Sequence, residues 1–344
     1  MPDPQPAADV VRLYWFWPER GRLSTLLGDE AVWRSYRRAA TAAGLELDVI
    51  SVDDVDVLAH PDAPVAYVRG AAVDPARAAF HAKLYTWPPF ASDVWRSLAT
   101  FQTLAPAGYF NLIRPELNLI TNDKAATLLH LRTVDDGWLT TLSMPTRDLD
   151  VLRVSLAEVG LGYPLVVKPA NWASGNGVSM VHTEEDLFTT VRLAGAAELT
   201  VVVQPLIGSG ASGPPDDVRV YCVEGAAVGA LRRTPPTGRL VANITAGGRG
   251  ELVDVPAPLR RRAEAVARYL DTPWLGVDFL GTDGTYWLSE VEIDACVGPV
   301  TSRLPGMAEV LAQRFAAYRA RFDRWLATEA SATGDRPTVV GARG

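Results

Sequence analysis

Residues 276–292, GVDFLGTDGTYWLSEVE, decide the fold. Two apolar halves flank residues 282–284 (TDG), a sequence typical of a tight turn between antiparallel strands. Side chains two residues apart in a strand share a face, so Glu290 and Glu292 lie together and hairpin pairing brings Asp278 beside them. Three such carboxylates repel one another unless a cation neutralises them, and their oxygens suit Mg²⁺. The alternative is an exposed strand edge with solvated acids.

Basic and amide side chains precede this hairpin on neighbouring predicted strands. One strand, over 218–223, begins with Asp217-Val218-Arg219, and the next, over 226–232, ends in Leu231-Arg232-Arg233. Asn243 follows in a loop with two glycines. Arginine recognises phosphate and carboxylate groups through two hydrogen bonds. Each signal is weak alone, because arginine is common in this chain.

Lysine is rare among the 33 basic residues and occurs only at positions 83, 124 and 168. Lys168 ends an apolar run and precedes the glycine-bearing stretch 172–178, and Lys124 precedes a helix-like segment. A compact ammonium group suits phosphate oxygens better than the larger planar guanidinium. The two lysines therefore indicate a phosphate site, unless the chain has simply been depleted of lysine.

Two common phosphate motifs do not explain these lysines. Residues 208–213 match G-x-G-x-x-G, but Pro214-Pro215 and another predicted strand follow where a dinucleotide-binding fold needs a helix. We interpret this stretch as a mobile loop. No lysine is followed by Ser or Thr, so the chain has no P-loop.

In their order, these motifs resemble the ATP-grasp superfamily, and most closely its RimK-type carboxylate–amine ligases. The resemblance covers about residues 115–325, and the order of the motifs is its specific part. The series is Asp123-Lys124, Pro145-Thr146, Val167-Lys168-Pro169, Gln204, Asp217-x-Arg219, Arg232-Arg233, Asn243, Gly276-Val277-Asp278 and Glu290-Val291-Glu292.

The resemblance implies a role for each matched position. Lys124 and Lys168 hold the α- and β-phosphates of ATP, and the loop from Ser174 to Val178, with Gly175 and Gly177, closes over the triphosphate. The backbone at Gln204 and Leu206 reads adenine. The remaining implied roles are Mg²⁺ or Mn²⁺ binding by Asp278, Glu290 and Glu292, contact with the transferred phosphoryl group by Arg233 and Asn243, and binding of the substrate carboxylate by Arg219 or Arg232.

Two positions depart from the family pattern. Pro205 stands where the family usually has an acidic residue, so the ribose contact is expected from Asp216 or Asp217. Glu292 stands where the family usually has Asn. The extra carboxylate either tightens metal binding or signals altered chemistry.

The predicted fold class is α/β plus α+β, an ATP-grasp fold behind an N-terminal pre-ATP-grasp α/β domain. Strand-like and helical segments alternate up to about residue 115, although the stretch 81–110 resists assignment. The predicted divisions are 1–115, an α/β domain; 116–206, a subdomain with the glycine loop; 207–329, a subdomain with the metal site; and 330–344, a flexible tail.

Composition excludes several classes of protein. A formal charge of −7 and a pI near 5.2 argue against a general nucleic-acid binder, and Arg260-Arg261-Arg262 is expected on the solvated side of a helix over 258–270. No membrane span or secretory signal is evident, so a cytoplasmic protein is expected. Cys222 and Cys296 lack metal-ligand spacing and are interpreted as reduced structural thiols. Homodimers are common in the family that the chain resembles, so the resemblance implies a possible homodimer.

The expected reaction is ATP-dependent amide formation through an acyl phosphate, with amino acids or a small peptide as carboxylate and amine substrates in bacterial metabolism. Positioning and charge neutralisation drive such phosphoryl transfer, so no nucleophilic side chain is needed. One alternative is an ATP-grasp kinase acting on a small molecule. Another is a non-catalytic nucleotide-binding protein in which Glu292 has cost activity.

Overall fold

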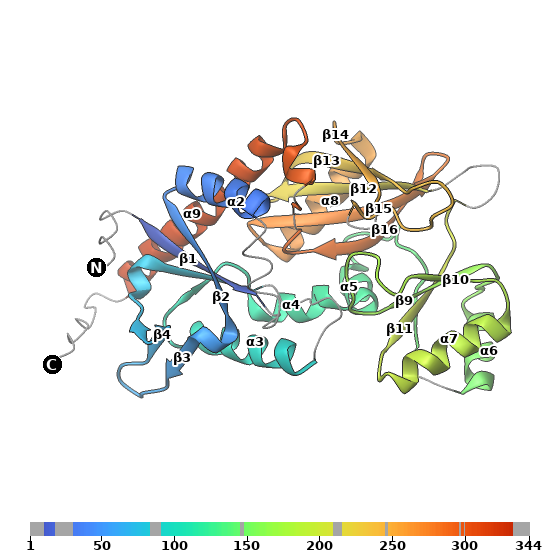
Figure 1. Ribbon diagram of the computed structural model, residues 1–344, viewed down its shortest axis with the longest axis horizontal. Helices are drawn as coiled ribbons and strands as arrows, with labels where there is room; N and C mark the ends of the chain where they lie inside the picture. Colours follow the sequence, from blue (N-terminus) through green and yellow to red (C-terminus); the bar gives the residue numbers. More distant parts are fainter. Residues whose placement is uncertain are drawn as a thin grey trace.

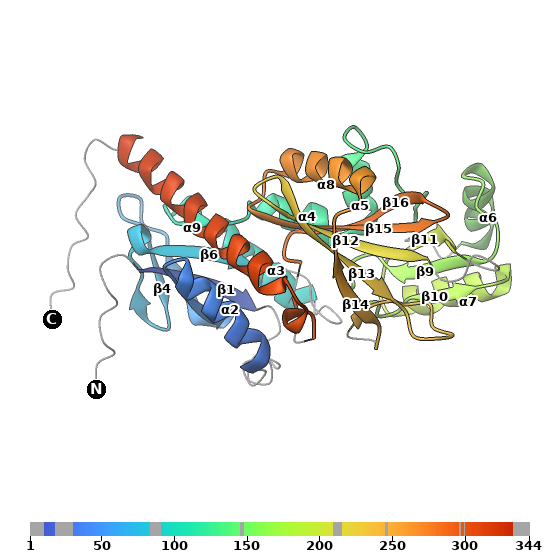
Figure 2. The same cartoon turned by 90° about the horizontal axis from the view of Figure 1, so that it is seen from above.

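The computed structural model describes most of the chain as three connected bodies, an N-terminal α/β layer, a small sheet with two helices, and a large antiparallel sheet (Figures 1 and 2). The described residues are 10–17, 30–82, 91–144, 148–208, 215–244, 247–295, 297–298 and 300–332.

The N-terminal layer is built on a parallel sheet of order β2-β1-β6-β7. Helices α2 (Glu30–Ala42) and α9 (Met307–Ala332) pack together on one face, and α3 (Ala91–Leu104) packs on the other. The predicted α/β layer is therefore confirmed. Its strands are β1 Val11–Trp17, β2 Leu45–Ser51, β6 Ala78–Ala82 and β7 Phe110–Asn111, with a side sheet of β3 Val55–Leu58, β4 Val65–Val68 and β5 Ala71–Ala72.

The small sheet has the order β10-β9-β11-β8 with antiparallel pairing throughout. Helix α7 begins at a capping box, in which the Thr183 hydroxyl accepts from the Asp186 N–H and the Asp186 carboxylate accepts from the Thr183 N–H. The elements are α4 Pro115–Asn122, α5 Lys124–Leu131, β8 Leu142–Met144, α6 Leu149–Glu158, β9 Leu165–Pro169, β10 Ser179–Val181, α7 Glu184–Ala196 and β11 Val201–Pro205.

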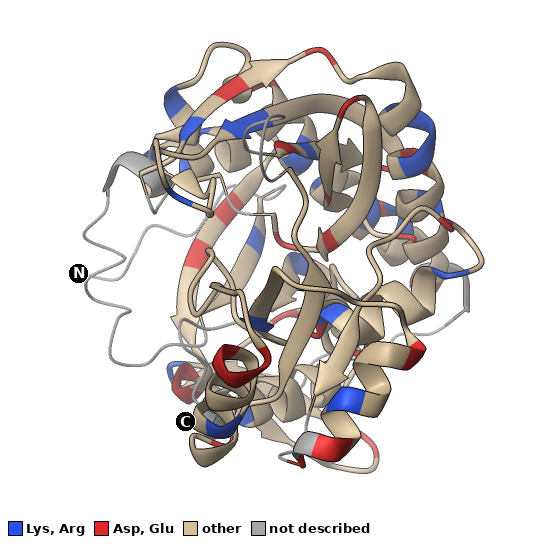
Figure 3. Ribbon diagram, turned by 90° about the vertical axis from the view of Figure 1, so that its right-hand side faces the viewer, with Lys and Arg blue, Asp and Glu red and all other residues tan. Residues whose placement is uncertain are grey.

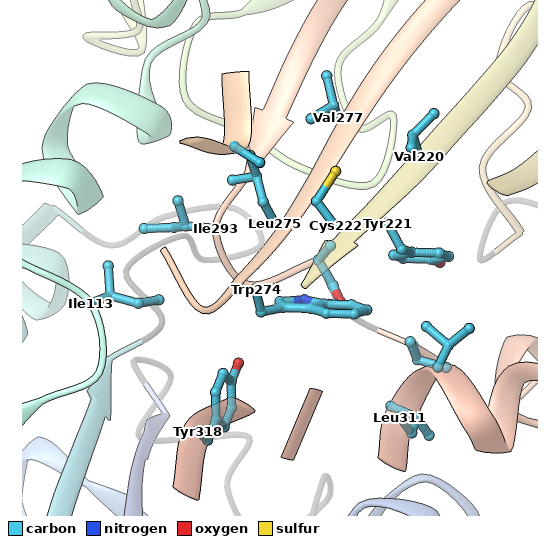
Figure 4. Packing of buried hydrophobic residues seen from close by; sticks show 14 of the residues in the cluster. Ile113, Val220, Tyr221, Cys222, Trp274, Leu275, Val277, Ile293, Leu311 and Tyr318 are labelled. Carbon is cyan, nitrogen blue, oxygen red and sulfur yellow. The ribbon is translucent and has the colours of Figure 1, made fainter. Parts of the chain in front are cut away.

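The large sheet has the order β14-β13-β12-β15-β16 and carries the predicted hairpin at one edge. Helix α8 packs against the sheet, and the buried core around it includes the Cys222 thiol and, on the opposite face of β12, Tyr221, whose ring stacks on Trp274 at a separation of 5.2 Å (Figure 4). The elements are β12 Asp216–Val223, β13 Ala226–Thr234, β14 Arg249–Val253, α8 Ala257–Leu270, β15 Trp274–Thr282 and β16 Thr285–Glu292.

Two expectations need correction. Arg260 and Arg261 are exposed as predicted, but Arg262 turns inward, where its guanidinium donates to both oxygens of Asp135 at 2.7 and 2.8 Å. Helix α9 continues to Ala332, so the first residues of the predicted tail are helical, and residues 333–344 lie outside the described part.

Pro145, Thr146 and Cys296, which the sequence singled out, also lie outside the described residues. Within the described part, no helix is long and apolar enough to cross a membrane. Basic and acidic residues are interspersed along the ribbon in the view of Figure 3.

Candidate active site

The hairpin brings the three predicted carboxylates onto adjacent positions. Asp278 lies opposite Glu290, and Gly276 lies opposite Glu292, so the acids occupy neighbouring rungs of the β15/β16 ladder. The register shifts between Asp278 and Phe279. Such a bulge re-aims the side chains beside it, a feature common at functional sites.

Arginine side chains neutralise these acids. The Arg219 guanidinium donates to both oxygens of Asp278 over 2.7 Å and also contacts Glu292 at 3.0 Å, while Arg233 donates to Asp278 over 2.8 Å and to Asp217. Burial alone would raise the pKa of Asp278, but the two guanidinium groups hold that pKa well below its usual value. Asp278 therefore stays ionised across the physiological range.

A large cavity opens between the two antiparallel sheets, with about 960 Å³ of empty space that includes its mouth. It brings together eleven of the fourteen predicted site residues from elements far apart in the sequence. They are Lys124, Lys168, Ser174, Gly175, Gln204, Leu206, Asp217, Arg233, Asn243, Asp278 and Glu290.

The other three predicted residues do not line this cavity. Gly177 lies in the glycine loop behind it, Arg219 is buried beneath Asp278, and Glu292 faces a second, smaller chamber. Arg232 also points elsewhere, with its side chain 43% exposed and paired with Asp216. Of the two acids expected near the ribose, Asp217 lines the cavity and Asp216 does not.

The glycine loop adopts backbone conformations that favour glycine. Gly175 and Gly177 have φ values of 74° and 68°, and a Cβ on Gly175 would lie 2.3 Å from the Val241 Cγ1 atom. This close approach seats the loop against residues 240–243, which also line the cavity. The loop and the 240–243 segment together form one wall of the cavity.

The two lysines have different surroundings. Burial, and then repulsion from Lys124, lower the pKa of Lys168 to about 8. Lys124 is 7% exposed, and its ammonium donates to the carbonyl of Trp172 over 2.7 Å and to those of Pro169 and Ala170 over 3.4 Å. It also pairs with Glu290 at 3.5 Å. Lys168 thus has the looser attachment of the two cations.

The smaller chamber adjoins the large cavity and shares Lys124, Trp172 and Glu290 with it. Its empty volume is about 440 Å³, again including the opening. This chamber was not predicted, because its amide side chains come from α4 and from the residues that follow β9. The other lining residues are Asn118, Thr121, Asn122, Asn171, Ala173, Glu292, Ile293 and Asp294.

The apolar part of the large cavity was also missed. Val166, Leu280 and Ile207 line it alongside the predicted Leu206. In the sequence these three residues look like ordinary buried apolar residues. No pattern therefore marked them as lining a cavity. Flat apolar walls of this kind suit a planar ring.

The carboxylates divide into two groups with respect to a metal ion. Asp278 and Glu290 face the same cavity, and Asp278 Oδ1 accepts one hydrogen bond from Arg219, so a lone pair remains. Two carboxylate oxygens fit Mg²⁺, which usually takes one or two such ligands and completes its shell with water and phosphate. Among the described residues, no three His, Cys, Asp or Glu side chains form a metal-binding group. Glu292 shares the Arg219 guanidinium with Asp278 and lines the smaller chamber together with Glu290, and its role as a third metal ligand stays a prediction.

Two antiparallel sheets that enclose a cavity beneath a glycine loop define an ATP-grasp protein. Residues 140–303 match the family model of the RimK-like ATP-grasp domain. A probable alpha-L-glutamate ligase of Shewanella halifaxensis is 29% identical over 119 residues, which cover 35% of this chain and 25% of that relative. The matched segment thus spans about a quarter of the relative's length.

Solved structures with the same fold cover nearly the whole chain. The D-cycloserine synthetase DcsG superposes with a TM-score of 0.64 at 19% identity, over 90% of this chain and 99% of its own. The ATP-grasp ligase PsnB, complexed with minimal precursor, Mg and ADP, gives a TM-score of 0.61 at 20% identity, over 90% and 97%. The ATP-grasp fold with its N-terminal α/β layer is therefore established.

Proposed function

We propose that this protein is an ATP-dependent carboxylate–amine ligase that forms an amide bond through an acyl phosphate. The large cavity carries the proposal, since it joins apolar walls, two lysines, Arg233 with Asn243, and a pair of carboxylates under a glycine loop. The RimK-like domain and the glutamate ligases it resembles support the same reaction class.

Each part of the cavity has a task in this reaction. Val166, Ile207 and Leu280 enclose the adenine, and Lys168 with the glycine loop binds the phosphates. Asp278 and Glu290 would hold the Mg²⁺ that accompanies the nucleotide, and such an ion supplies charge neutralisation at the phosphate oxygens. Bound ADP and Mg in PsnB support this assignment. Mn²⁺ use, a homodimer and residence in the cytoplasm stay predictions from the sequence.

The chemistry proceeds in two steps. A substrate carboxylate oxygen attacks the γ-phosphorus, the bond to the bridging oxygen breaks, and ADP leaves. The amine nitrogen then attacks the acyl carbon, the carbon–oxygen bond to phosphate breaks, and the nitrogen loses a proton. Arg233 and Asn243 stand at the phosphoryl group, where preorganised donors stabilise developing charge.

The test is phosphate release from MgATP against amino acids and short peptides, singly and in pairs. Release that needs two partners, and that falls about a hundredfold or more in Lys168→Ala and Glu290→Gln, supports the ligase. Glu251→Gln, an exposed acid on β14, is the matched control and should keep full activity. A stable phosphorylated product from one partner would instead identify a kinase. ADP binding without release for any pair would identify a nucleotide-binding protein.

A further inference from the structure

Arg262, expected from the sequence on the solvent side of α8, instead holds a segment that passes beside the large cavity. This segment, here called the connector, comprises residues 132–141 between α5 and β8. The Arg262 guanidinium donates to both oxygens of Asp135, at 2.7 and 2.8 Å, and to the carbonyl of Gly137 at 2.7 Å. It also donates to the carbonyl of Tyr286 on β16 at 2.7 Å. One side chain of α8 therefore joins the connector to the edge strand of the large sheet.

The surroundings of this guanidinium show that it is built into the structure. Asp135 is 5% exposed, and the guanidinium carbon of Arg262 lies 4.9 Å from the ring centre of the buried Phe279. A Cβ atom on Gly137 would lie 2.7 Å from the Arg262 Nη2 atom, so the connector backbone passes directly against the guanidinium. A lysine carries its donors on a single nitrogen and cannot span the same acceptors. The position therefore requires the planar fork of an arginine.

Beyond Gly137 the connector pairs with β16. The Leu288 N–H donates to the Gly137 carbonyl over 2.8 Å, and the Leu139 N–H donates to the Leu288 carbonyl over 3.3 Å. Leu288 lies two residues before Glu290, which faces the large cavity, and Leu139 lines that cavity as well. Arg262 lies outside the cavity, but the connector that it holds forms part of the cavity wall.

The far end of the connector reaches the small sheet. The Thr141 hydroxyl donates to the Leu139 carbonyl over 2.8 Å and accepts from the Gln204 amide over 2.7 Å. Gln204 is 2% exposed, lies on β11 and lines the same cavity. A continuous series of hydrogen-bonded residues thus links Arg262 to Gln204. The connector therefore fixes the positions of Leu139 and Gln204 relative to each other.

We propose that Arg262 is a positioning residue of the nucleotide site, which holds Leu139 and Gln204 in place against the base through the connector. This inference rests on the proposed function, which assigns the large cavity to ATP. The groups assigned to the phosphates have other supports, because Lys168 lies on β9 and the glycine loop packs against residues 240–243. Arg262 accordingly governs binding of the base and leaves binding of the phosphates unchanged.

The first experiment uses calorimetry to separate the base from the phosphates, since ADP carries both and inorganic tripolyphosphate carries phosphates alone. Arg262→Lys should weaken ADP binding about tenfold, the effect of one displaced hydrogen bond to the base, and should change tripolyphosphate binding by less than about twofold. The matched control is Arg261→Gln, an exposed residue of the same helix, which should leave both affinities unchanged. An unchanged affinity for ADP in Arg262→Lys, or an equal loss for both ligands, would overturn the proposal.

The second experiment reaches the same contact from the connector. Gly137→Ala places a Cβ where the Arg262 guanidinium lies, so it should displace the fork without removing a charge and weaken ADP binding by a similar factor. Because both changes break one contact, the double variant should bind ADP about as well as either single variant. Losses that add in full would show that the two residues act independently, against the proposal. In the phosphate-release assay each single variant should raise the KM for ATP about tenfold and lower kcat much less.

The outcomes separate a positioning role from a structural one, and this proposal from the ligase. A variant that unfolds at a lower denaturant concentration but binds ADP as the parent does would give Arg262 a purely structural role. Phosphate release that needs two substrates, with ADP binding independent of Arg262, would leave the ligase standing and refute the positioning role. ADP binding that depends on Arg262 as expected, in a protein that releases no phosphate with any pair, would support the positioning role and refute the ligase.

Discussion

The lowered pKa of Lys168 makes nucleotide affinity depend on pH in a direction that can be worked out. Below about pH 8 the free protein carries the ammonium form, and above it the neutral amine. A bound phosphate favours the charged form, so affinity falls as the pH rises through the pKa of the free protein. About nine-tenths of Lys168 is charged at pH 7 and about one-tenth at pH 9, which gives a loss of about tenfold.

Calorimetric titration with ADP from pH 7 to pH 9 at constant ionic strength measures this loss. Lys168→Arg is the matched control, because a guanidinium stays charged across the range and its profile should be flat. Its affinity at pH 7 should be lower than the parent's, since the planar group is larger. A parent affinity that changes less than about twofold would refute the lowered pKa of Lys168. The same decline in Lys168→Arg would refute Lys168 as the group whose titration sets the affinity for ADP.

Three further predictions concern the surroundings of the cavity. Arg219→Met leaves the buried Asp278 and the partly buried Glu292 without their shared cation and should cost about 3–5 kcal/mol in denaturant unfolding; a loss below about 1 kcal/mol would contradict the ion-pair network. Gly175→Ala places a Cβ against Val241 at positive φ and should weaken ADP binding about tenfold or more, and unchanged affinity would mean that the loop does not close on the nucleotide. Cys222, whose pKa burial raises to about 12, should react with a thiol reagent only after unfolding when tested in a Cys296→Ser background; rapid reaction in the folded state would show the thiol to be accessible.

The parts of the fold that were predicted well from the sequence are those that a short local pattern specifies. The TDG turn and the alternation around it defined the β15/β16 hairpin. Strand β6 was missed because all five of its residues are buried, so period-two alternation was absent. Arg262 was misjudged because its partner, Asp135, comes from a distant part of the chain.

The same holds for the site: residues that belong to a local sequence motif were predicted, and arrangements that depend on contacts between distant segments were not. Motif order identified most of the large cavity, since each motif lies on a single strand or loop. The bridging of Asp278 and Glu292 by the Arg219 fork was not predictable, because it depends on pairing between strands far apart in the sequence and on the bulge beside Asp278. The chamber depends on α4 meeting the end of β16, a tertiary contact that leaves no local pattern.

Helix α9 has a consequence for the order in which the protein can be assembled on the ribosome. The first strand, β1, buries Trp15 against Tyr36 of α2 and Phe315 of α9, with ring separations of 5.7 and 6.5 Å. Residues 11–50 therefore leave the ribosome long before the helix that covers them has been translated. Domains generally fold as they emerge, N-terminal first. Here the layer that is synthesised first is the last to acquire its complete core.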